Sequence, residues 1–440
     1  MSSKTSSEVW AGLPGRRTWR SVAIGAGALS GSSESSEEPR AAAREVADVL
    51  LEHGHETYFA GGCVRDHLLG LVPADIDVAT EAVPDRVLEL FPGARGVGAS
   101  FGVMLVPRRG RMLEVATFRS DFAYEDGRRP GRVSFGSAEA DALRRDFTIN
   151  GIFEHPVTGA IVDFVGGRDD IEQKVLRAIG EPEDRFDEDR LRMLRGIRFA
   201  ARFDLTIDPA TEAAITARAD RLAGVSRERV GQEMRRMLAD PGRVKAARLA
   251  ESTGLDRTIL GSSRQGPATF DRLSGLSSNV VWIDALVAWE LDRSSAADMA
   301  DRLSTHLVLS NEERLEVAEL LATRRQLRHE WKDLAIAGRK RLASTSLFER
   351  TLKFVGIEWP DLATEIGDSV MELRKTGLNP PRLLSGDDLI GAGISPGPAF
   401  GRVLFSVYDA QLEGRIQTKE EALVLARKAL NLDSRGLNAG

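Results

Sequence analysis

The sequence predicts an α+β fold, in which a compact α/β head is followed by a long all-helical part. From residue 39 to about 180, apolar residues at helical spacing alternate with short β-branched and aromatic runs. Beyond about 180 the strand signals fade, and helical periodicity continues nearly to the end. Residues 1–38, rich in Ser, Gly and Glu, are expected to form a disordered extension. We therefore expect a head at 39–180, a helical neck at 181–260, and a helical body and tail at 261–440.

The helices and strands of the head are expected in alternating order. Apolar spacing predicts helices, and alternation with β-branched residues predicts strands. The expected helices are AAAREVADVLLEHG (41–54) and VPDRVLELF (83–91), and the expected strands are TYFA (57–60), DIDVAT (75–80), GVMLV (102–106) and MLEVATF (112–118). The last two strands are joined by a polar turn and should pair with each other.

Composition narrows the class of protein. The 440 residues include one cysteine, Cys63, so no internal disulfide can form, and this fits a reducing cytoplasm. No apolar run is long enough for a transmembrane helix, and we expect no membrane partner. The net charge of −6 argues against a uniformly basic nucleic-acid binder, but it does not exclude a basic face.

Asp75 and Asp77 form the first candidate site. Alternate residues of a strand point to the same side, so the two carboxylates should lie side by side while Ile76 enters the core. Two like charges this close repel unless a cation neutralises them, and hard oxygen ligands suit Mg²⁺. An isolated Asp-x-Asp is more often a surface pair, so the neighbouring residues must indicate whether this pair belongs to a metal site.

Gly61 and Gly62 supply that context. They follow one expected strand and precede a helix, where glycine allows close approach of a phosphate to the backbone. Arg65, one turn later, could add a charged fork, whereas Cys63 is expected to be a small filler. The spacing is that of neither a P-loop nor a dinucleotide fingerprint. Together with the aspartates, the segment predicts a metal–triphosphate site.

The segment GGCVRDHLLG…DIDVAT resembles motif A of the superfamily of class II tRNA nucleotidyltransferases and bacterial poly(A) polymerases. Further motifs follow in the family order, namely LEVATFR (113–119), RRDFTIN (144–150), DFVGGRDDI (163–171) and EDRLRMLRGIRFAAR (188–202). The resemblance implies a polymerase-β-like nucleotidyltransferase head. It also implies two Mg²⁺ ions held by Asp75 and Asp77, with Glu114 on a neighbouring strand completing the carboxylate cluster.

The motif RRDFTIN is expected to start a helix beside the site at residues 144–146. By resemblance, Arg145 would contact the nucleotide phosphates, and Asp146 and Asn150 would accept the ribose 2′-hydroxyl proton. This would favour ribonucleotides. The alternative is a capping Asp and a helix-end Asn without a ligand.

Asp189 and Arg192 are expected to select the base. Three residues apart on a predicted helix, they would share one face and offer one acceptor and one donor fork. Cytosine and adenine each present a donor amine beside an acceptor ring nitrogen, whereas guanine and uracil present the reverse order. The pair would therefore accept CTP and ATP and leave buried polar groups unpaired with the others. The alternative is an ordinary surface ion pair.

Arg195 and Arg198 continue the same spacing, and the strip curls around the helix. Both are assigned to the nucleotide mainly by resemblance, with Arg195 nearer the base and Arg198 towards phosphate. The polar, glycine-rich segment 121–133 looks like the flexible loop of the family, although an ordinary connector fits its composition equally well.

The resemblance implies template-independent addition of CCA to tRNA 3′ ends from CTP and ATP. A poly(A) polymerase and a split enzyme that adds only CC or only A stay open as alternatives, because they share these motifs. A catalytically silent RNA-binding protein on the same scaffold is a further alternative, but the sequence speaks against it, because Asp75, Asp77, Arg145, Asp189 and Arg192 are all present. Residues 94–119 and 383–404 look more like the tRNA enzymes. The helical body would bind the acceptor and elbow region of tRNA, and the oligomeric state is left open.

Overall fold

The computed structural model describes residues 33–98, 102–124, 130–267, 269–294, 297–394 and 396–436. Residues 1–32 of the expected extension lie outside these ranges, and a helix already begins at Ser33. The chain divides into two compact units between Arg221 and Leu222, and each unit is described by itself. The finer boundaries at 180 and 260 stay predictions.

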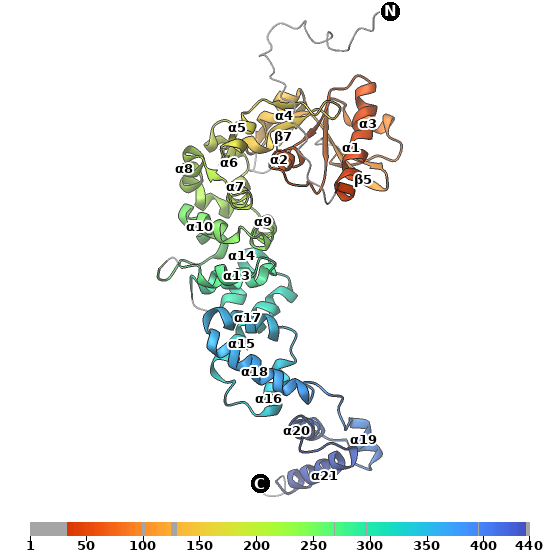
Figure 1. Ribbon diagram of the computed structural model, residues 1–440, viewed down its shortest axis with the longest axis vertical. Helices are drawn as coiled ribbons and strands as arrows, with labels where there is room; N and C mark the ends of the chain where they lie inside the picture. Colours follow the sequence, from red (N-terminus) through yellow and green to blue (C-terminus); the bar gives the residue numbers. More distant parts are fainter. Residues whose placement is uncertain are drawn as a thin grey trace, which may run out of the picture. The chain divides into compact units, whose positions relative to one another are not determined.

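The first unit is built on a mixed β-sheet (Figure 1). Within the described ranges the strand order is β3-β4-β5-β2-β1-β8-β9, and neighbouring strands of this sheet pair antiparallel except β2 with β5, which pair in parallel. The strands are β1 Thr57–Ala60, β2 Asp77–Thr80, β3 Arg95–Gly98, β4 Val103–Arg108, β5 Arg111–Thr117, β8 Ile152–Glu154 and β9 Ile161–Asp163. The four strands expected from the sequence are confirmed, with β2 beginning two residues later.

The helices of this unit pack around the sheet. Helix α1 contacts β1, β2, β4 and β5, and α2 contacts β1 and β8. Two short strands, β10 Val175–Leu176 and β11 Thr206–Ile207, pair in parallel. The helices are α1 Ser33–Glu52, α2 Gly62–Leu68, α3 Pro84–Leu90, α4 Ala138–Leu143, α5 Gly167–Glu172, α6 Pro182–Glu188, α7 Leu191–Arg202 and α8 Pro209–Arg218, with 3₁₀ turns η2 Thr148–Asn150 and η3 Ala219–Gly224.

The sheet separates an apolar row from a polar row. Phe59 pairs with Val78, and Val78 pairs with Val115, so these buried side chains form one row across three strands. Asp77 and Glu114 each precede a member of that row, on neighbouring strands, and side chains alternate along a strand. Both carboxylates therefore belong to the opposite face, where β1, β2 and α4 contribute a second buried cluster that includes Phe153.

Residues 121–133 differ from the expected loop. Strands β6 Arg119–Tyr124 and β7 Pro130–Phe135 pair antiparallel, and their tip at 125–129 lies outside the described residues. The polar composition concealed the strands, because backbone pairing, and not an apolar face, defines this ribbon.

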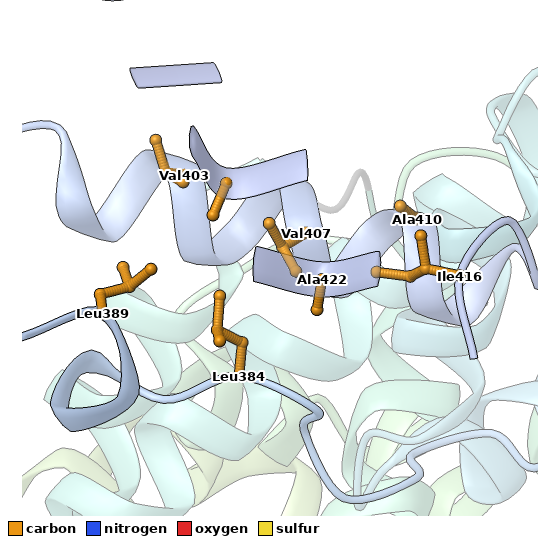
Figure 2. Close-up of a cluster of buried hydrophobic side chains, with 8 residues drawn as sticks. Leu384, Leu389, Val403, Val407, Ala410, Ile416 and Ala422 are labelled. Carbon is orange, nitrogen blue, oxygen red and sulfur yellow. The ribbon is translucent and has the colours of Figure 1, made fainter. Parts of the chain in front are cut away.

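The second unit is helical, as expected from the sequence (Figure 1). Its helices are α9 Arg227–Ala239, α10 Arg243–Thr253, α11 Leu255–Leu260, α12 Asp271–Gly275, α13 Trp282–Leu291, α14 Met299–Leu307, α15 Asn311–His329, α16 Ile336–Ala343, α17 Phe348–Glu358, α18 Pro360–Lys375, α19 Gly386–Gly391, α20 Phe400–Leu412 and α21 Lys419–Gly436. Figure 2 shows a separate core near the C-terminus, where Leu389 faces Val403 and Val407 from another helix. In the part of the chain that the structure describes, no helix has the length and apolarity to cross a membrane.

Candidate active site

The glycine pair opens the site at the end of β1. Gly61 has a φ of +70°, which L side chains rarely adopt, and a Cβ there would lie 2.8 Å from Arg145 Nη1. A Cβ on Gly62 would lie 3.5 Å from Arg65 Nη2. Gly61 therefore makes room for the Arg145 guanidinium group, whereas a side chain at position 62 would only touch Arg65 at an ordinary contact distance. Sequence reasoning expected a phosphate at this turn with Arg65 beside it, and did not foresee that Arg145 lies against Gly61.

Asp77 begins β2 directly opposite Ala60 of β1, and Ile76 is buried as expected. Asp75 lies two residues before the strand and is exposed. Although Asp77 reaches solvent, its pKa is raised to about 6 by desolvation first, then by the negative charges of Glu114 and Asp75, against an opposing effect of Arg145. The three acidic groups thus act on one another as the sequence suggested.

A closed three-ligand metal centre is not preformed. Among the described residues, no group of three or more His, Cys, Asp or Glu side chains is arranged to hold a metal ion. Asp75 and Asp77 offer an oxygen pair, and Glu114 contributes its charge from the neighbouring strand β5. This donor set fits a hard divalent cation, because, in addition to burial, Glu114 and Asp75 both raise the pKa of Asp77 and the opposing charge of Arg145 does not cancel their effect.

The motif RRDFTIN (144–150) follows a helix and does not start one. Helix α4 ends at Leu143, and Arg144 is its C-cap, so the expectation of a helix beginning at 144–146 is wrong. The side chain of Asp141, about one helical turn earlier, holds both arginines. Arg144 donates to Oδ1 at 2.9 and 2.5 Å, and Arg145 donates to Oδ2 at 3.1 and 2.8 Å.

Arg145 lies between Asp141 and the aspartate pair. Its Nη1 also donates to the Asn150 carbonyl at 3.1 Å, and its guanidinium lies 5.1 Å from the Phe153 ring centre. Asp141 is almost completely buried, and its pKa is lowered because the two arginines outweigh the effect of burial. Arg145 is therefore held rigidly beside Gly61 with its charge acting on Asp77.

Four predicted site residues form one hydrogen-bonded chain. Arg65 donates to Asn150 Oδ1 at 2.6 Å, and Asn150 Nδ2 donates to Asp146 Oδ1 at 2.9 Å. Arg195 Nε and Nη2 donate to Asp146 Oδ2 at 3.0 and 2.7 Å. Burial alone would raise the pKa of Asp146, but Arg195 and Asn150 lower it to about 2. Asp66, which sequence reasoning missed, anchors the free end by accepting two bonds from Arg65 at 2.8 and 2.6 Å.

An aromatic pair supports the same arginines. Phe199 of α7 and Phe203, which directly follows that helix, stack with ring centres 6.1 Å apart and an interplanar angle of 16°. The Arg65 guanidinium lies 4.3 Å from the Phe203 ring centre, and that of Arg198 lies 4.2 Å from Phe199. Arg198 is buried, so in the described structure it packs against this pair. The four-residue spacing of the two phenylalanines was visible in the sequence, but it is equally typical of two core residues on one face of a helix.

Asp189 and Arg192 do not share a helix face. Helix α6 ends at Glu188, and Asp189 is extended, with φ −144° and ψ 102°, before α7 begins at Leu191. Its Oδ1 accepts a hydrogen bond from Leu191 N at 3.1 Å, because a short acidic side chain at a helix start satisfies a free N–H. The expected single helix is therefore wrong at its first residues.

Arg192 is buried in the first turn of α7. Its Nη1 donates to Glu188 Oε2 at 2.6 Å and to the Arg185 carbonyl at 3.2 Å, and its Nη2 donates to the Arg144 carbonyl at 3.1 Å. Arg192 thus ties α6 and α7 to the end of α4. Glu188 was not predicted, although its four-residue spacing to Arg192 could have indicated the pair.

Cys63 is a buried thiol beside this site. Its Sγ donates to the Ala60 carbonyl at 3.2 Å, and burial raises its pKa to about 11. A thiol of this kind is a poor nucleophile, which agrees with its expected role as a filler.

Comparison with known proteins shows which protein family the head of this chain matches. Residues 57–177 match the family described as poly A polymerase head domain, and residues 204–261 match the probable RNA and SrmB-binding site of polymerase A. A crystal structure of the Bacillus stearothermophilus CCA-adding enzyme in complex with CTP superposes with a TM-score of 0.70 and 27% identity, covering 90% of this chain and 99% of that one. The fold and the site therefore define a head domain of the poly(A) polymerase type.

Curated relatives narrow the family. A CCA-adding enzyme from Bacillus cytotoxicus is 32% identical over 399 residues, which is 86% of this chain and 95% of that protein. One from Geobacillus thermodenitrificans is 44% identical over 220 residues, so that the match spans about half of each protein, 49% of this chain and 54% of the relative. The chain belongs to the CCA-adding enzyme family, which confirms the superfamily expected from the sequence.

Proposed function

We propose that this protein is a nucleotidyltransferase that adds CCA to tRNA 3′ ends from CTP and ATP. The observation that carries the proposal is that Asp77 lies within reach of the charges of Asp75, Glu114 and the clamped Arg145, which lies beside Gly61 at the end of β1. Opposite charges arranged in this way suit a metal-bound triphosphate. The relatives named as CCA-adding enzymes support this choice of product.

Asp75 and Asp77 would hold Mg²⁺, with Glu114 adding negative charge beside them. When bound, the metal would activate the RNA 3′-hydroxyl and stabilise charge on the triphosphate during in-line displacement. Arg145, fixed by Asp141, would bind the phosphates. Because Gly61 carries no side chain, the guanidinium group of Arg145 can lie against the backbone at this turn.

The ribose and the base would be recognised on the other side of Arg65. Asp146 and Asn150 would face the ribose 2′-hydroxyl, held in place by Arg65 and Arg195. Asp189 would accept the amine of cytosine or adenine, and Arg192 would donate to the ring nitrogen. Arg198 would contribute positive charge from the next turn of α7.

The alternatives differ in product and not in these residues. A poly(A) polymerase would use ATP alone, and a split enzyme would add only CC or only A. A silent RNA-binding protein would not need Asp75, Asp77 and Arg145 together. We expect the enzyme to act on tRNA in the cytoplasm, with the helical unit holding the acceptor and elbow region.

The direct test is nucleotide addition to defined tRNA transcripts. Transcripts that end before the CCA, after its second cytidine, and after the full CCA are incubated with protein, Mg²⁺ and CTP, ATP or both. Three nucleotides added to the first transcript, followed by a stop, would support the proposal. A long adenosine ladder would identify a poly(A) polymerase, addition of only CC or only A would identify a split enzyme, and no product would favour the silent binder.

A further inference from the structure

The helical unit contains a cavity of about 230 Å³ that the proposed catalytic site does not use. Its polar lining consists of Arg227, Arg257, Thr258 and His306, and its remaining lining is apolar. Neither Asp nor Glu occurs among the described residues that line it. The cavity therefore presents positive charge and hydrogen-bond donors without an acidic partner in its wall.

The fold fixes two of these groups in place. Arg227 begins α9, and its Nη1 donates to the Thr305 carbonyl at 2.8 Å, which anchors the guanidinium at the end of α14. His306 packs against Gly261, whose φ is +65° and whose added Cβ would lie 2.2 Å from His306 Nε2. Because only glycine fits there without displacing the ring, the backbone itself shapes this wall of the cavity.

The electrostatics agree with an unneutralised positive cavity. The pKa of His306 is lowered by desolvation first and then by the positive charges of Arg227 and Arg302, against a hydrogen bond with the Thr258 backbone. Arg302 affects His306 even though it forms an ion pair with Glu290 at 2.7 Å. An anion entering the cavity would be attracted by the guanidinium groups of Arg227 and Arg257.

From this geometry we infer that the cavity binds a phosphate group of the RNA backbone. Two guanidinium groups, a hydroxyl and an imidazole are the donors that phosphate contacts use. No aromatic side chain other than His306 is among the described lining residues, so base stacking is not favoured. Arg227 and Arg257 both lie within residues 204–261, the segment that matches an RNA-binding family.

The inference rests on the proposed function, because it takes the substrate to be tRNA. It adds a contact that positions the RNA and carries no sequence information. Loss of the contact should therefore weaken RNA binding without changing which nucleotide is added.

Arg257→Glu in the full chain provides the test, because this side chain is exposed and its replacement should not disturb the core. The matched control is Arg325→Glu, another exposed arginine of the helical unit outside the cavity. We expect Arg257→Glu to weaken binding of a tRNA transcript about tenfold and to make the slope of log K against log salt shallower by about one. Arg257→Lys should restore most of the affinity, and the control should bind like the wild type.

Several outcomes would overturn the inference. These are wild-type affinity of Arg257→Glu, an equal loss in the Arg325→Glu control, or stabilisation by inorganic phosphate that depends on Arg257 while tRNA affinity does not. The last result would identify a site for a small free anion. Failure of the proposed function is separate, since it would appear as wild-type protein that binds tRNA without adding nucleotides.

Discussion

The Arg195 guanidinium donates two hydrogen bonds to one carboxylate oxygen of Asp146, at 3.0 and 2.7 Å. The sequence had assigned these residues to different parts of the nucleotide, Asp146 to the ribose and Arg195 to the base. The ion pair joins α7 to the segment after α4, and Asn150 extends it to Arg65. The ribose and base contacts are therefore expected to move together, since one network holds them.

The first prediction concerns the strength of this pair. In a double-mutant cycle of Asp146→Asn and Arg195→Gln, we expect a coupling of about 1 to 3 kcal/mol in the free energy of urea unfolding, because the carboxylate is buried. The exposed pair Arg168 and Glu172 is the control and should couple by less than about 0.5 kcal/mol. Equal coupling in both cycles would show that the buried Asp146–Arg195 pair contributes no more to stability than an exposed ion pair.

The second prediction is the pH dependence of the same pair. The pKa of Asp146 is lowered from its ordinary value of 3.8 to about 2, so its contribution is complete above pH 3.8 and is lost as pH falls towards 2. Between about pH 5 and pH 2, the stability difference between wild type and Asp146→Asn should shrink by about 2 kcal/mol. Urea unfolding at several pH values measures this difference. A constant difference would contradict the depressed pKa.

Much of the head followed from sequence patterns. Strands β1, β2, β4 and β5 were expected because apolar alternation is local, and the same alternation placed Ile76 in the core beside Asp77. Glu114 was expected on a neighbouring strand, and the parallel pairing of β2 with β5 places it there. The assigned roles of these residues stay predictions, since the geometry shows proximity and charge but no ligand.

Helix ends and distant partners did not follow from the sequence. Asp141 and Glu188 hold arginines near the ends of short helices, and Asp189 starts a helix, so periodicity alone misplaced both segments. Arg65 meets Asn150 across 85 residues of chain, which no local spacing encodes. The polar ribbon β6–β7 lacks the apolar pattern by which strands are found.

The third prediction tests Asp141 as a positioning residue. Asp141→Asn removes the charge that holds Arg145, while Glu139→Gln changes an exposed acid on the same helix and is the control. We expect KM for both CTP and ATP to rise about tenfold in Asp141→Asn, with tRNA affinity unchanged, because a charge-assisted hydrogen bond contributes roughly 1.5 to 3 kcal/mol. A uniform fall in kcat, KM and RNA binding would instead indicate general destabilisation.

The fourth prediction separates backbone strain from steric overlap at the glycine turn. Gly61 and Gly70 have φ values of +70° and +72°, but only a Cβ on Gly61 meets Arg145, since nothing lies within 4 Å of one on Gly70. Gly70→Ala should lose about 1 kcal/mol of unfolding free energy, and Gly61→Ala should lose more than about 1 kcal/mol, because its ψ of −125° lies outside the left-handed helical region. Only Gly61→Ala should also raise KM for nucleotides. Identical kinetics in the two variants would remove the proposed link between the glycine turn and Arg145.

The fifth prediction concerns the aspartate pair. Asp75→Ala and Asp77→Ala should each slow nucleotide addition at least about 100-fold, because each removes a ligand from a site whose metal supplies several kcal/mol. Binding of tRNA should not weaken, since a carboxylate makes no favourable contact with phosphate. Asp85→Ala, which removes another acid from the same unit on α3, is the control and should retain activity. Full activity of the double variant Asp75→Ala/Asp77→Ala would place the metal elsewhere, whereas lost activity with intact tRNA binding would assign these carboxylates to catalysis.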